Sequence, residues 1–455
     1  MEPIKTFELS KEYLESLREG IELNDNDFIS QSLEGVNVAD IAAILDELNM
    51  DEAIYVLRLL EPTVSADILI ELDEDSLIKV IREMKAIELA TLIDQMDSDD
   101  AADILILMPS KEREEVIDNL QDREKSSHIL ELLRYDEDSA GGLMAKEFIK
   151  ANQNWNVIQT IEEIRRQAEK VEKIYSIYVV DNRQHLLGRV SLKKIILASS
   201  DTKISDIYEP ELISVPTYMD GEEVAEIMRK YDLESMPVVN AKNRLVGRIT
   251  VDDILDLIRE QSEEDMQAMT GISADVEESD SVFRISKARL PWLLIGVIGG
   301  LMGAGIIDFF EAGLQKIIAL ASFIPLVAAT GGNVGIQSSS LVVQTLASKS
   351  VFDDTPWQRF VKGLLIALVN GVVLGSFVVL VVVFLYKHEW IFGVTIGLAM
   401  FCVVLMASFM GTVTPLVLNK FGINPAIASG PFITTANDLL GLAVYFGVAM
   451  WLLQI

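Results

Sequence analysis

The chain has 455 residues, enough for two or three domains, and a formal net charge of −32. The charge is divided unevenly, because residues 1–283 carry a net charge of −35 and residues 284–455 carry +3. An acidic region of this size repels nucleic acid and anionic lipid and concentrates cations, which excludes a nucleic-acid-binding protein. The single cysteine, Cys402, excludes a disulfide framework and a thiolate metal site.

The N-terminal third of the chain predicts a helical repeat. Asp51, Asp75 and Asp99 recur at intervals of 24 residues, and each opens a helix-like stretch. A repeat of this length is typical of stacked helical hairpins, so we expect a small superhelix between residues 35 and 135. The N-terminus has no apolar core of signal-peptide length, and we therefore expect residues 1–283 to be cytosolic.

A second repeat, of mixed strands and helices, follows with an offset of 59 residues. Residues 177–196 align without gaps on residues 236–255, and each copy predicts a strand, a polar turn, a second strand and a helix begun by a hydroxyl residue. The pair resembles tandem CBS motifs (the Bateman module), an α/β module that commonly binds adenine nucleotides or metal, often as a dimer. A ribose-binding signature of that module is a hydroxyl residue followed three positions later by Asp. Thr250 and Asp253 match it in the second copy, which makes ATP a candidate ligand.

Residues 253–270 continue as an acidic helix that leads through a polar linker to the first apolar stretch. Ile254, Leu257 and Ile258 share one helical face and are available for packing, while acidic residues line another face. A solvated linker helix is the simpler alternative.

Five apolar stretches follow Arg289, each long enough to span about 30 Å of hydrocarbon. They cover residues 290–310, 317–347, 360–386, 391–418 and 425–453. With a cytosolic N-terminal region, an odd number of spans places the C-terminus outside. The distribution of basic residues agrees, because only Lys316 and Lys387 lie at the expected outer ends, whereas seven lie at the inner ends: Arg284, Lys287, Arg289, Lys349, Arg359, Lys362 and Lys420.

Pro325 and the polar, glycine-rich residues 330–335 predict a broken second span whose main chain lines a cavity. Pro431 and residues 434–438 give the last span matching features, and paired interrupted spans facing one site recur in transporters. An alternative for the glycines is close packing between helices.

Asp438 lies within the last apolar stretch with no basic residue in its own helix. A carboxylate at that depth costs about 3 kcal/mol on insertion, and its usual tasks are binding a cation, relaying protons or pairing with a base. The neighbouring Asn and Thr side chains supply neutral oxygens but no counter-charge, which favours a cation.

Two such carboxylates related by a dimer axis could hold hydrated Mg²⁺, which prefers oxygen ligands and releases its waters reluctantly. Soft metal ligands are scarce, because the three histidines (128, 185 and 388) lie outside the apolar stretches, and this argues against Cu and Zn.

Several motifs give the chain a resemblance to the MgtE family of Mg²⁺ channels. They are GGNVGIQSS at 331–339, TTANDLLGL at 434–442 and RYDEDSAGGLM at 134–144. The resemblance implies a multidomain, homodimeric plasma-membrane protein with its pore on the two-fold axis. Asp438 would be the Mg²⁺ site of the pore, with Asn333 near it. The implied domains are a helical repeat (1–136), a tandem CBS domain (137–255), a connecting helix and linker (256–283) and an all-α domain of five spans (284–455).

The resemblance also implies that cytosolic Mg²⁺ binds between acidic surfaces and holds the pore shut. The matching positions are Asp67, Asp99 and Asp103 in the helical repeat, Glu222, Asp232 and Asp253 in the CBS domain, and Asp256, Glu264 and Asp265 in the connecting helix. Gln261 and Asn424 depart from the family pattern, because relatives can carry an acid at each. Acidic surfaces repel one another unless a cation neutralises them, so free Mg²⁺ would shift an equilibrium between packed and splayed domains.

Two other functional classes stay open: a membrane-anchored CBS sensor of nucleotide or metal, and a proton-coupled transporter of divalent cations. An enzyme is not expected, because the chain has no P-loop pattern, nucleophile elbow or zinc motif. A CBS-bearing chloride channel would need about twice as many spans.

Overall fold

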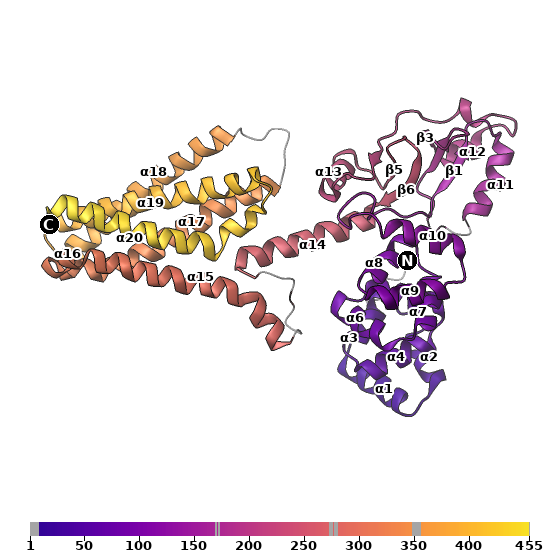
Figure 1. Ribbon diagram of the computed structural model, residues 1–455, viewed down its shortest axis with the longest axis horizontal. Helices are drawn as coiled ribbons and strands as arrows, with labels where there is room; N and C mark the ends of the chain where they lie inside the picture. The colour runs from indigo at the N-terminus through magenta and orange to yellow at the C-terminus, as the bar shows by residue number, and fades with distance from the viewer. Residues whose placement is uncertain are drawn as a thin grey trace. The chain divides into compact units, whose positions relative to one another are not determined.

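The computed structural model describes residues 9–168, 171, 173–272, 276, 281–347 and 356–454. Contacts within the chain divide it into two units, Met1–Ile258 and Arg259–Ile455 (Figure 1). Among the predicted flanking residues, Lys349 lies outside the described part of the chain.

The first unit begins with short helices that confirm the predicted helical repeat. Helices α4, α6 and α8 begin at residues 50, 74 and 98, and helices α3, α5, α7 and α9 begin at residues 38, 62, 86 and 110, so both series keep the 24-residue spacing of the sequence. The helices are α1 (Lys11–Glu22), α2 (Asn26–Leu33), α3 (Val38–Asp46), α4 (Met50–Leu59), α5 (Pro62–Glu71), α6 (Glu74–Glu83), α7 (Ala86–Ile93), α8 (Ser98–Ile106), α9 (Ser110–Asn119) and α10 (Arg123–Leu132).

Repetition of N-capping residues explains part of this regularity. Asn49 accepts a hydrogen bond from the backbone of Glu52 at the start of α4, and Asp73 accepts one from Ser76 at the start of α6. Such caps satisfy backbone N–H groups that have no partner within the helix. Asp97 holds the same position before α8, but its side chain makes no capping hydrogen bond.

The CBS repeat forms two three-stranded sheets of the same topology, β1-β2-β3 and β4-β5-β6. In each sheet the first two strands are parallel and the last two are antiparallel. The irregularity at Val179/Val180 recurs at Val238/Val239, which confirms the predicted alignment of the copies. The elements are β1 (Ile149–Asn152), α11 (Val157–Ala168), β2 (Ile177–Val180), β3 (Leu186–Val190), α12 (Leu192–Leu197), the 3₁₀ helix η1 (Ile204–Asp206), β4 (Val215–Pro216), α13 (Gly221–Tyr231), β5 (Ser235–Val239) and β6 (Leu245–Thr250).

Helix α14 (Val251–Thr270) is the predicted acidic helix. Its apolar face is only partly used within the described residues, because Ile254 and Leu257 are buried in the core of the second CBS copy while Ile258 and Met266 are exposed.

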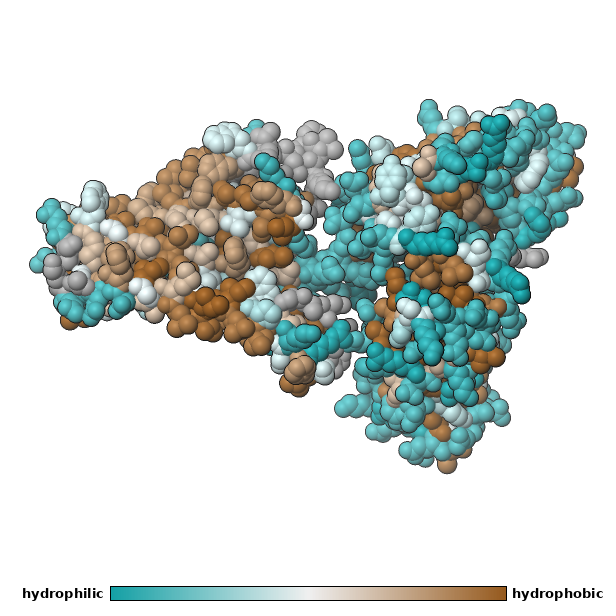
Figure 2. All heavy atoms as spheres, in the orientation of Figure 1, coloured by the Kyte–Doolittle hydropathy of each residue, from teal (hydrophilic) through white to brown (hydrophobic). Residues whose placement is uncertain are grey.

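Within its described residues, the second unit contains five helical segments that are long and apolar enough to cross a membrane. They cover Val282–Phe309, Ile318–Leu346, Phe360–Leu385, Trp390–Lys420 and Pro425–Leu453, close to the predicted spans. Hydrophobic residues cover much of the visible surface of these helices (Figure 2). The elements are α15 (Val282–Phe309), α16 (Glu311–Lys316), the 3₁₀ helix η2 (Ile318–Phe323), α17 (Ile324–Ala347), α18 (Pro356–Leu380), the π-helical turn η3 (Val381–Leu385), α19 (Trp390–Lys420), the 3₁₀ helix η4 (Pro425–Ser429) and α20 (Pro431–Leu453).

The predicted break inside the second span is wrong. Helix α17 is continuous through residues 330–335, and the irregular backbone lies before it, in η2. Pro325 falls in the first turn of α17, where a proline is tolerated because its missing N–H would have no partner in the helix. The glycines instead permit close packing: a Cβ on Gly335 would overlap the side chain of Asn437, and one on Gly411 would lie 2.5 Å from the carbonyl oxygen of Gly335.

Candidate metal centre

Three carboxylates come together within the first unit, and we call Asp97, Asp99 and Glu147 the acidic cluster. One oxygen from each lies within 4.8 Å of the others, the single group of this kind among the described residues. Asp97 precedes α8, Asp99 lies in its first turn, and Glu147 precedes β1. The geometry suits a hard divalent cation, for which carboxylate oxygens are the preferred ligands.

Asp99 provides the independent indication of a ligand. Its side chain is 8 % exposed, and its Oδ1 is buried without a hydrogen-bond partner. A buried carboxylate oxygen that lacks both a donor and a cation is costly, so the oxygen needs a proton or a metal ion.

The pKa values of Asp99 and the acidic residues around it also indicate a need for protons or a cation. Burial, followed by the charges of Asp100 and Asp253, raises the pKa of Asp99 well above its ordinary value. Burial and the charges of Asp253 and Asp97 raise the pKa of Asp100 to about 8. Burial also raises the pKa of Asp253 to about 6. Without a cation, Asp99 and Asp100 therefore retain protons near neutral pH, whereas Asp253 takes up a proton only at mildly acidic pH, and a bound cation would replace these protons.

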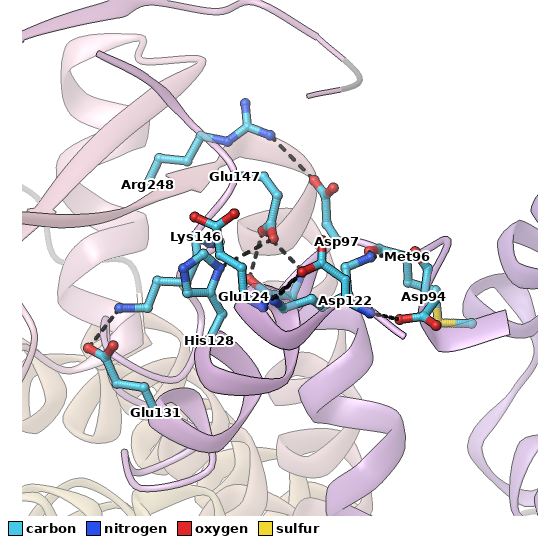
Figure 3. A network of polar contacts seen from close by, with 12 residues as sticks. Asp94, Met96, Asp97, Asp122, Glu124, His128, Glu131, Lys146, Glu147 and Arg248 are labelled. Carbon is cyan, nitrogen blue, oxygen red and sulfur yellow. Dashed lines mark hydrogen bonds and ion pairs between the residues drawn. The ribbon is translucent and has the colours of Figure 1, made fainter. Parts of the chain in front are cut away.

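Glu147 is fixed by donors from the helical repeat (Figure 3). Its Oε2 accepts hydrogen bonds from Ser98 N at 3.1 Å and Ser98 Oγ at 2.7 Å, and its Oε1 lies 3.9 Å from His128 Nδ1. Burial alone would raise the pKa of Glu147, but the nearby His128 ring and the hydrogen bonds from Ser98 bring this pKa below its ordinary value. Glu147 therefore stays ionised and contributes a full negative charge to the acidic cluster.

A basic side chain borders the acidic cluster. Arg248 on β6 places its Nη2 3.5 Å from Asp97 Oδ2 (Figure 3). Both members of this pair are largely shielded from water, with side-chain exposures of 7 % for Arg248 and 30 % for Asp97.

The residues of the predicted ribose signature bind each other in this structure. Asp253 Oδ2 accepts hydrogen bonds from the backbone nitrogen of Thr250 at 2.9 Å and from its Oγ1 at 2.7 Å. Asp253 thus lies at the start of α14, and its charge reaches both Asp99 and Asp100.

The other predicted regulatory residues are more dispersed. Asp103 on α8 is exposed, and its charge helps to raise the pKa of Asp100. Asp67 on α5 and Glu222 and Asp232 at the two ends of α13 are exposed and belong to no group of three close ligands in the described part of the chain. On α14, Asp256 and Glu264 are exposed, whereas Asp265 accepts a 2.8 Å hydrogen bond from Asn424 Nδ2.

The sequence predicted Asp99 and Asp253 as metal ligands but did not single out Asp97, Glu147 or Arg248. Asp97 had a signal, because it continues the 24-residue series of Asn49 and Asp73. Glu147 had none, since it lies between the two repeats.

The predicted pore residues lie in the second unit. Asp438 is half-buried on α20, and its Oδ1 would lie 3.8 Å from a Cβ built on Gly332 of α17. The next residue of α17, Asn333, is exposed. No ion pair involves Asp438 among the described residues, so no base explains its presence in an apolar helix.

Comparison with known proteins assigns the chain to a family. Residues 36–138 match the MgtE intracellular N domain, residues 204–260 a CBS domain and residues 324–448 the divalent cation transporter domain of MgtE. The magnesium transporter MgtE of Enterococcus faecalis is 37 % identical over 327 residues, which is 72 % of either chain. The chain belongs to the MgtE family. The magnesium transporter MgtE of Thermus thermophilus is 35 % identical over 339 residues, 74 % of this chain and 75 % of the relative.

Two solved structures support the MgtE assignment for about half of the chain. The cytosolic domain of the Mg²⁺ channel MgtE in complex with ATP has a TM-score of 0.51 and 33 % identity, and covers 54 % of this chain and 99 % of that one. The soluble part of a magnesium transporter has a TM-score of 0.50 and 29 % identity, and covers 55 % and 99 %. The resemblance predicted from the sequence motifs is therefore confirmed. The MgtE relatives are named as transporters, which is a non-enzymatic role.

Proposed function

We propose that this chain is a Mg²⁺ channel of the plasma membrane that works as a homodimer, with Asp438 of each copy facing a shared pore. The observation that carries the proposal is the half-buried carboxylate of Asp438, unpaired among the described residues and adjacent to Gly332 in an apolar unit of five spans. The names of the MgtE relatives supply the ion.

Passage of the ion through such a pore needs no covalent chemistry. Two carboxylates offer charge that matches one divalent cation, and Mg²⁺ keeps several of its waters when few protein ligands are available. The exposed amide of Asn333 would then orient water molecules rather than displace them. Binding through a water shell is weak enough to let the ion leave, which conduction requires.

We further propose that cytosolic Mg²⁺ closes the channel by binding at the acidic cluster. In the absence of metal, these carboxylates repel one another or take up protons. A bound cation would join α8 of the helical repeat to Glu147 at the entry to the CBS domain and, through Asp253, to the start of α14. The other acidic residues that the family resemblance implies are proposed as additional Mg²⁺ ligands: Asp67, Asp103, Glu222, Asp232, Asp256, Glu264 and Asp265.

The domain division and the orientation belong to the same proposal. Residues 1–136, 137–255 and 256–283 would form the cytosolic helical repeat, CBS domain and connecting segment, and residues 284–455 the membrane domain with its C-terminus outside. ATP is a candidate regulator at Thr250 and Asp253, supported by the ATP complex of the MgtE relative. Its ribose would compete with the hydrogen bonds that now join these two residues.

Flux of Mg²⁺ into vesicles that contain only this protein tests the pore. Asp438→Ala should abolish flux, because the pore loses the charge that attracts a divalent cation, while crosslinking still detects the dimer. The conservative variant Asp438→Glu should retain measurable flux. Wild-type flux in Asp438→Ala would refute the pore assignment.

The same vesicles separate the proposal from its alternatives. A CBS sensor without transport would give no Mg²⁺ flux in the wild type. A proton-coupled transporter would respond to an imposed pH gradient at constant Mg²⁺, whereas a channel would follow the Mg²⁺ gradient and the membrane potential.

A further inference from the structure

Arg248 differs from its counterpart in the first CBS copy. The 59-residue offset aligns Arg248 with Arg189, and the neighbouring glycines and strands align as well. Arg189 forms an exposed ion pair with Glu209, at 3.4 Å and with side-chain exposures of 42 % and 43 %. Arg248 is 7 % exposed and reaches out of its own repeat to Asp97. The second copy thus places a shielded cation where the first has an ordinary surface pair.

Asp97 departs from its own repeat in the same way. Its equivalents Asn49 and Asp73 cap helices α4 and α6, whereas the Asp97 side chain makes no capping hydrogen bond. Its carboxylate instead lies 3.5 Å from Arg248 and forms part of the acidic cluster (Figure 3). The helical repeat therefore departs from its pattern at Asp97, and the CBS repeat departs from its pattern at Arg248. These two residues form one ion pair with each other.

Arg248 is held firmly in position. Its backbone exchanges two hydrogen bonds with Ala145, at 2.8 and 3.0 Å. Its Nη1 donates to the carbonyl of Lys173 at 3.3 Å, and the guanidinium lies 5.4 Å from the centre of the Tyr175 ring. An arginine side chain stays charged at every relevant pH, so the acidic cluster always has a cation at its edge.

We propose that Arg248 is a built-in competitor of the divalent cation, which neutralises Asp97 in the metal-free protein and thereby sets the Mg²⁺ concentration at which the acidic cluster fills. This inference rests on the proposed regulatory function of the acidic cluster. A metal ion at Asp97 must displace or repel the guanidinium, and this repulsion weakens binding. Weak binding is useful in a sensor, because a site that is always full cannot respond to a change in concentration.

The test is a Mg²⁺ titration of the full-length protein in detergent, with thermal unfolding as the readout, since a ligand that binds the folded state raises its stability. Arg248→Met keeps an apolar side chain against Tyr175 but removes the charge. We expect the half-saturating Mg²⁺ concentration to fall at least about fivefold, because the competing charge lies within a few ångströms of the site. Arg248→Lys, which keeps the charge, should stay within about twofold of the wild type.

Arg189→Met is the matched control, because it makes the same substitution at the aligned position away from the acidic cluster, and it should leave the half-saturating concentration unchanged. If Arg248 were only a structural ion pair, Arg248→Met would loosen the contact and weaken Mg²⁺ binding. An unchanged or raised half-saturating concentration would therefore overturn the proposal. If Arg248→Met does not fold, Arg248→Gln serves, since its amide can still donate to the carbonyl of Lys173.

Asp99→Asn distinguishes failure of this inference from failure of the proposed function. If Asp99→Asn leaves the wild-type titration unchanged, the acidic cluster is no regulatory site and both proposals fall. If Asp99→Asn weakens Mg²⁺ binding while Arg248→Met has no effect, only the role of Arg248 is refuted.

Discussion

At the scale of single residues, protons and metal ions compete for the same oxygens. Asp99 Oδ1 is buried without a donor, and Asp100 and Asp253 have pKa values of about 8 and about 6. Leaving all three of these groups ionised in a shielded site would cost several kcal/mol. Protonation lowers this cost, so Mg²⁺ bound at the proposed site would release protons.

This competition predicts a pH dependence of stability. The folded-state pKa values of Asp99, Asp100 and Asp253 are raised above the unfolded values, mainly by burial. Their contribution to stability is therefore fully present below about pH 4 and is lost as the pH rises through the folded-state values. Mg²⁺ reverses the loss, so we expect the Mg²⁺-induced increase in melting temperature of the full chain to be larger at pH 8 than at pH 6.

Asp100→Asn checks the origin of this effect. It removes the group whose pKa of about 8 lies within the tested range, and it should reduce the difference between the two pH values. An equal Mg²⁺-induced shift at pH 6 and pH 8 in the wild type would contradict the competition between protons and metal.

At the scale of elements, helix α14 continues across the boundary between the two units, which lies between Ile258 and Arg259. Its N-terminal residues Ile254 and Leu257 belong to the core of the second CBS copy. Its C-terminal part contacts the segment before α20 in the second unit: Asp265 accepts a hydrogen bond from Asn424, and a Cβ on Gly430 would lie 2.5 Å from the carbonyl oxygen of Met269. Because α20 carries Asp438, a displacement of this part of α14 would change the packing of the proposed pore helix.

The hydrogen bond from Asn424 to Asp265 forms without a metal ion, whereas two carboxylates at this distance would repel each other unless a cation neutralised them. Asn424→Asp would replace the amide donor with a second negative charge at a distance of 2.8 Å from Asp265. We expect the variant to need about two- to tenfold more cytosolic Mg²⁺ for half-inhibition of flux, because the cation must first neutralise the repulsion.

Asn419→Asp provides the matched control for this measurement. Asn419 is exposed near the end of α19, so the same change of charge occurs without a carboxylate partner in the described contacts. A half-inhibiting concentration that is the same in Asn424→Asp, Asn419→Asp and the wild type would exclude a role for the Asn424–Asp265 contact in closure.

The sequence predicted elements well where a physical pattern repeats and poorly where it does not. The 24-residue and 59-residue periods located the helices and strands of the first unit, because each repeat preserves the spacing of apolar residues and caps. Pro325 and the glycines gave a wrong prediction for α17, because these residues interrupt helices in water but are tolerated in a first turn and at close helix contacts. Glu147 and Arg248 could not be assigned to a site, because their proximity to Asp97 depends on how two different repeats pack.

At the scale of the whole molecule, the division of charge along the chain matches the proposed separation of regulation from ion conduction. The acidic residues are concentrated in 1–283, and the apolar spans that contain Asp438 lie in the unit Arg259–Ile455. Regulation then requires two states of the cytosolic region that differ in affinity for Mg²⁺, because a ligand shifts an equilibrium only by its differential affinity. The acidic cluster provides such a difference if its ligands separate when the helical repeat and the CBS domain move apart.

Neutralising Asp99 and Asp103 together tests this requirement in the full channel. Asp99→Asn with Asp103→Asn removes a buried proposed ligand and a nearby charge, so Mg²⁺ should bind the packed state less tightly. We expect the cytosolic Mg²⁺ concentration for half-inhibition of current in reconstituted protein to rise at least about tenfold, which corresponds to a loss of about 1.4 kcal/mol of differential binding. The control is Asp51→Asn with Asp75→Asn, because both residues occupy the position of Asp99 in the earlier repeats, outside the acidic cluster. Of these three repeat positions, Asp99 alone lies beside the carboxylates of Asp97 and Glu147. Closure therefore does not depend on the acidic cluster if inhibition is unchanged in the first double variant or is weakened equally in both double variants.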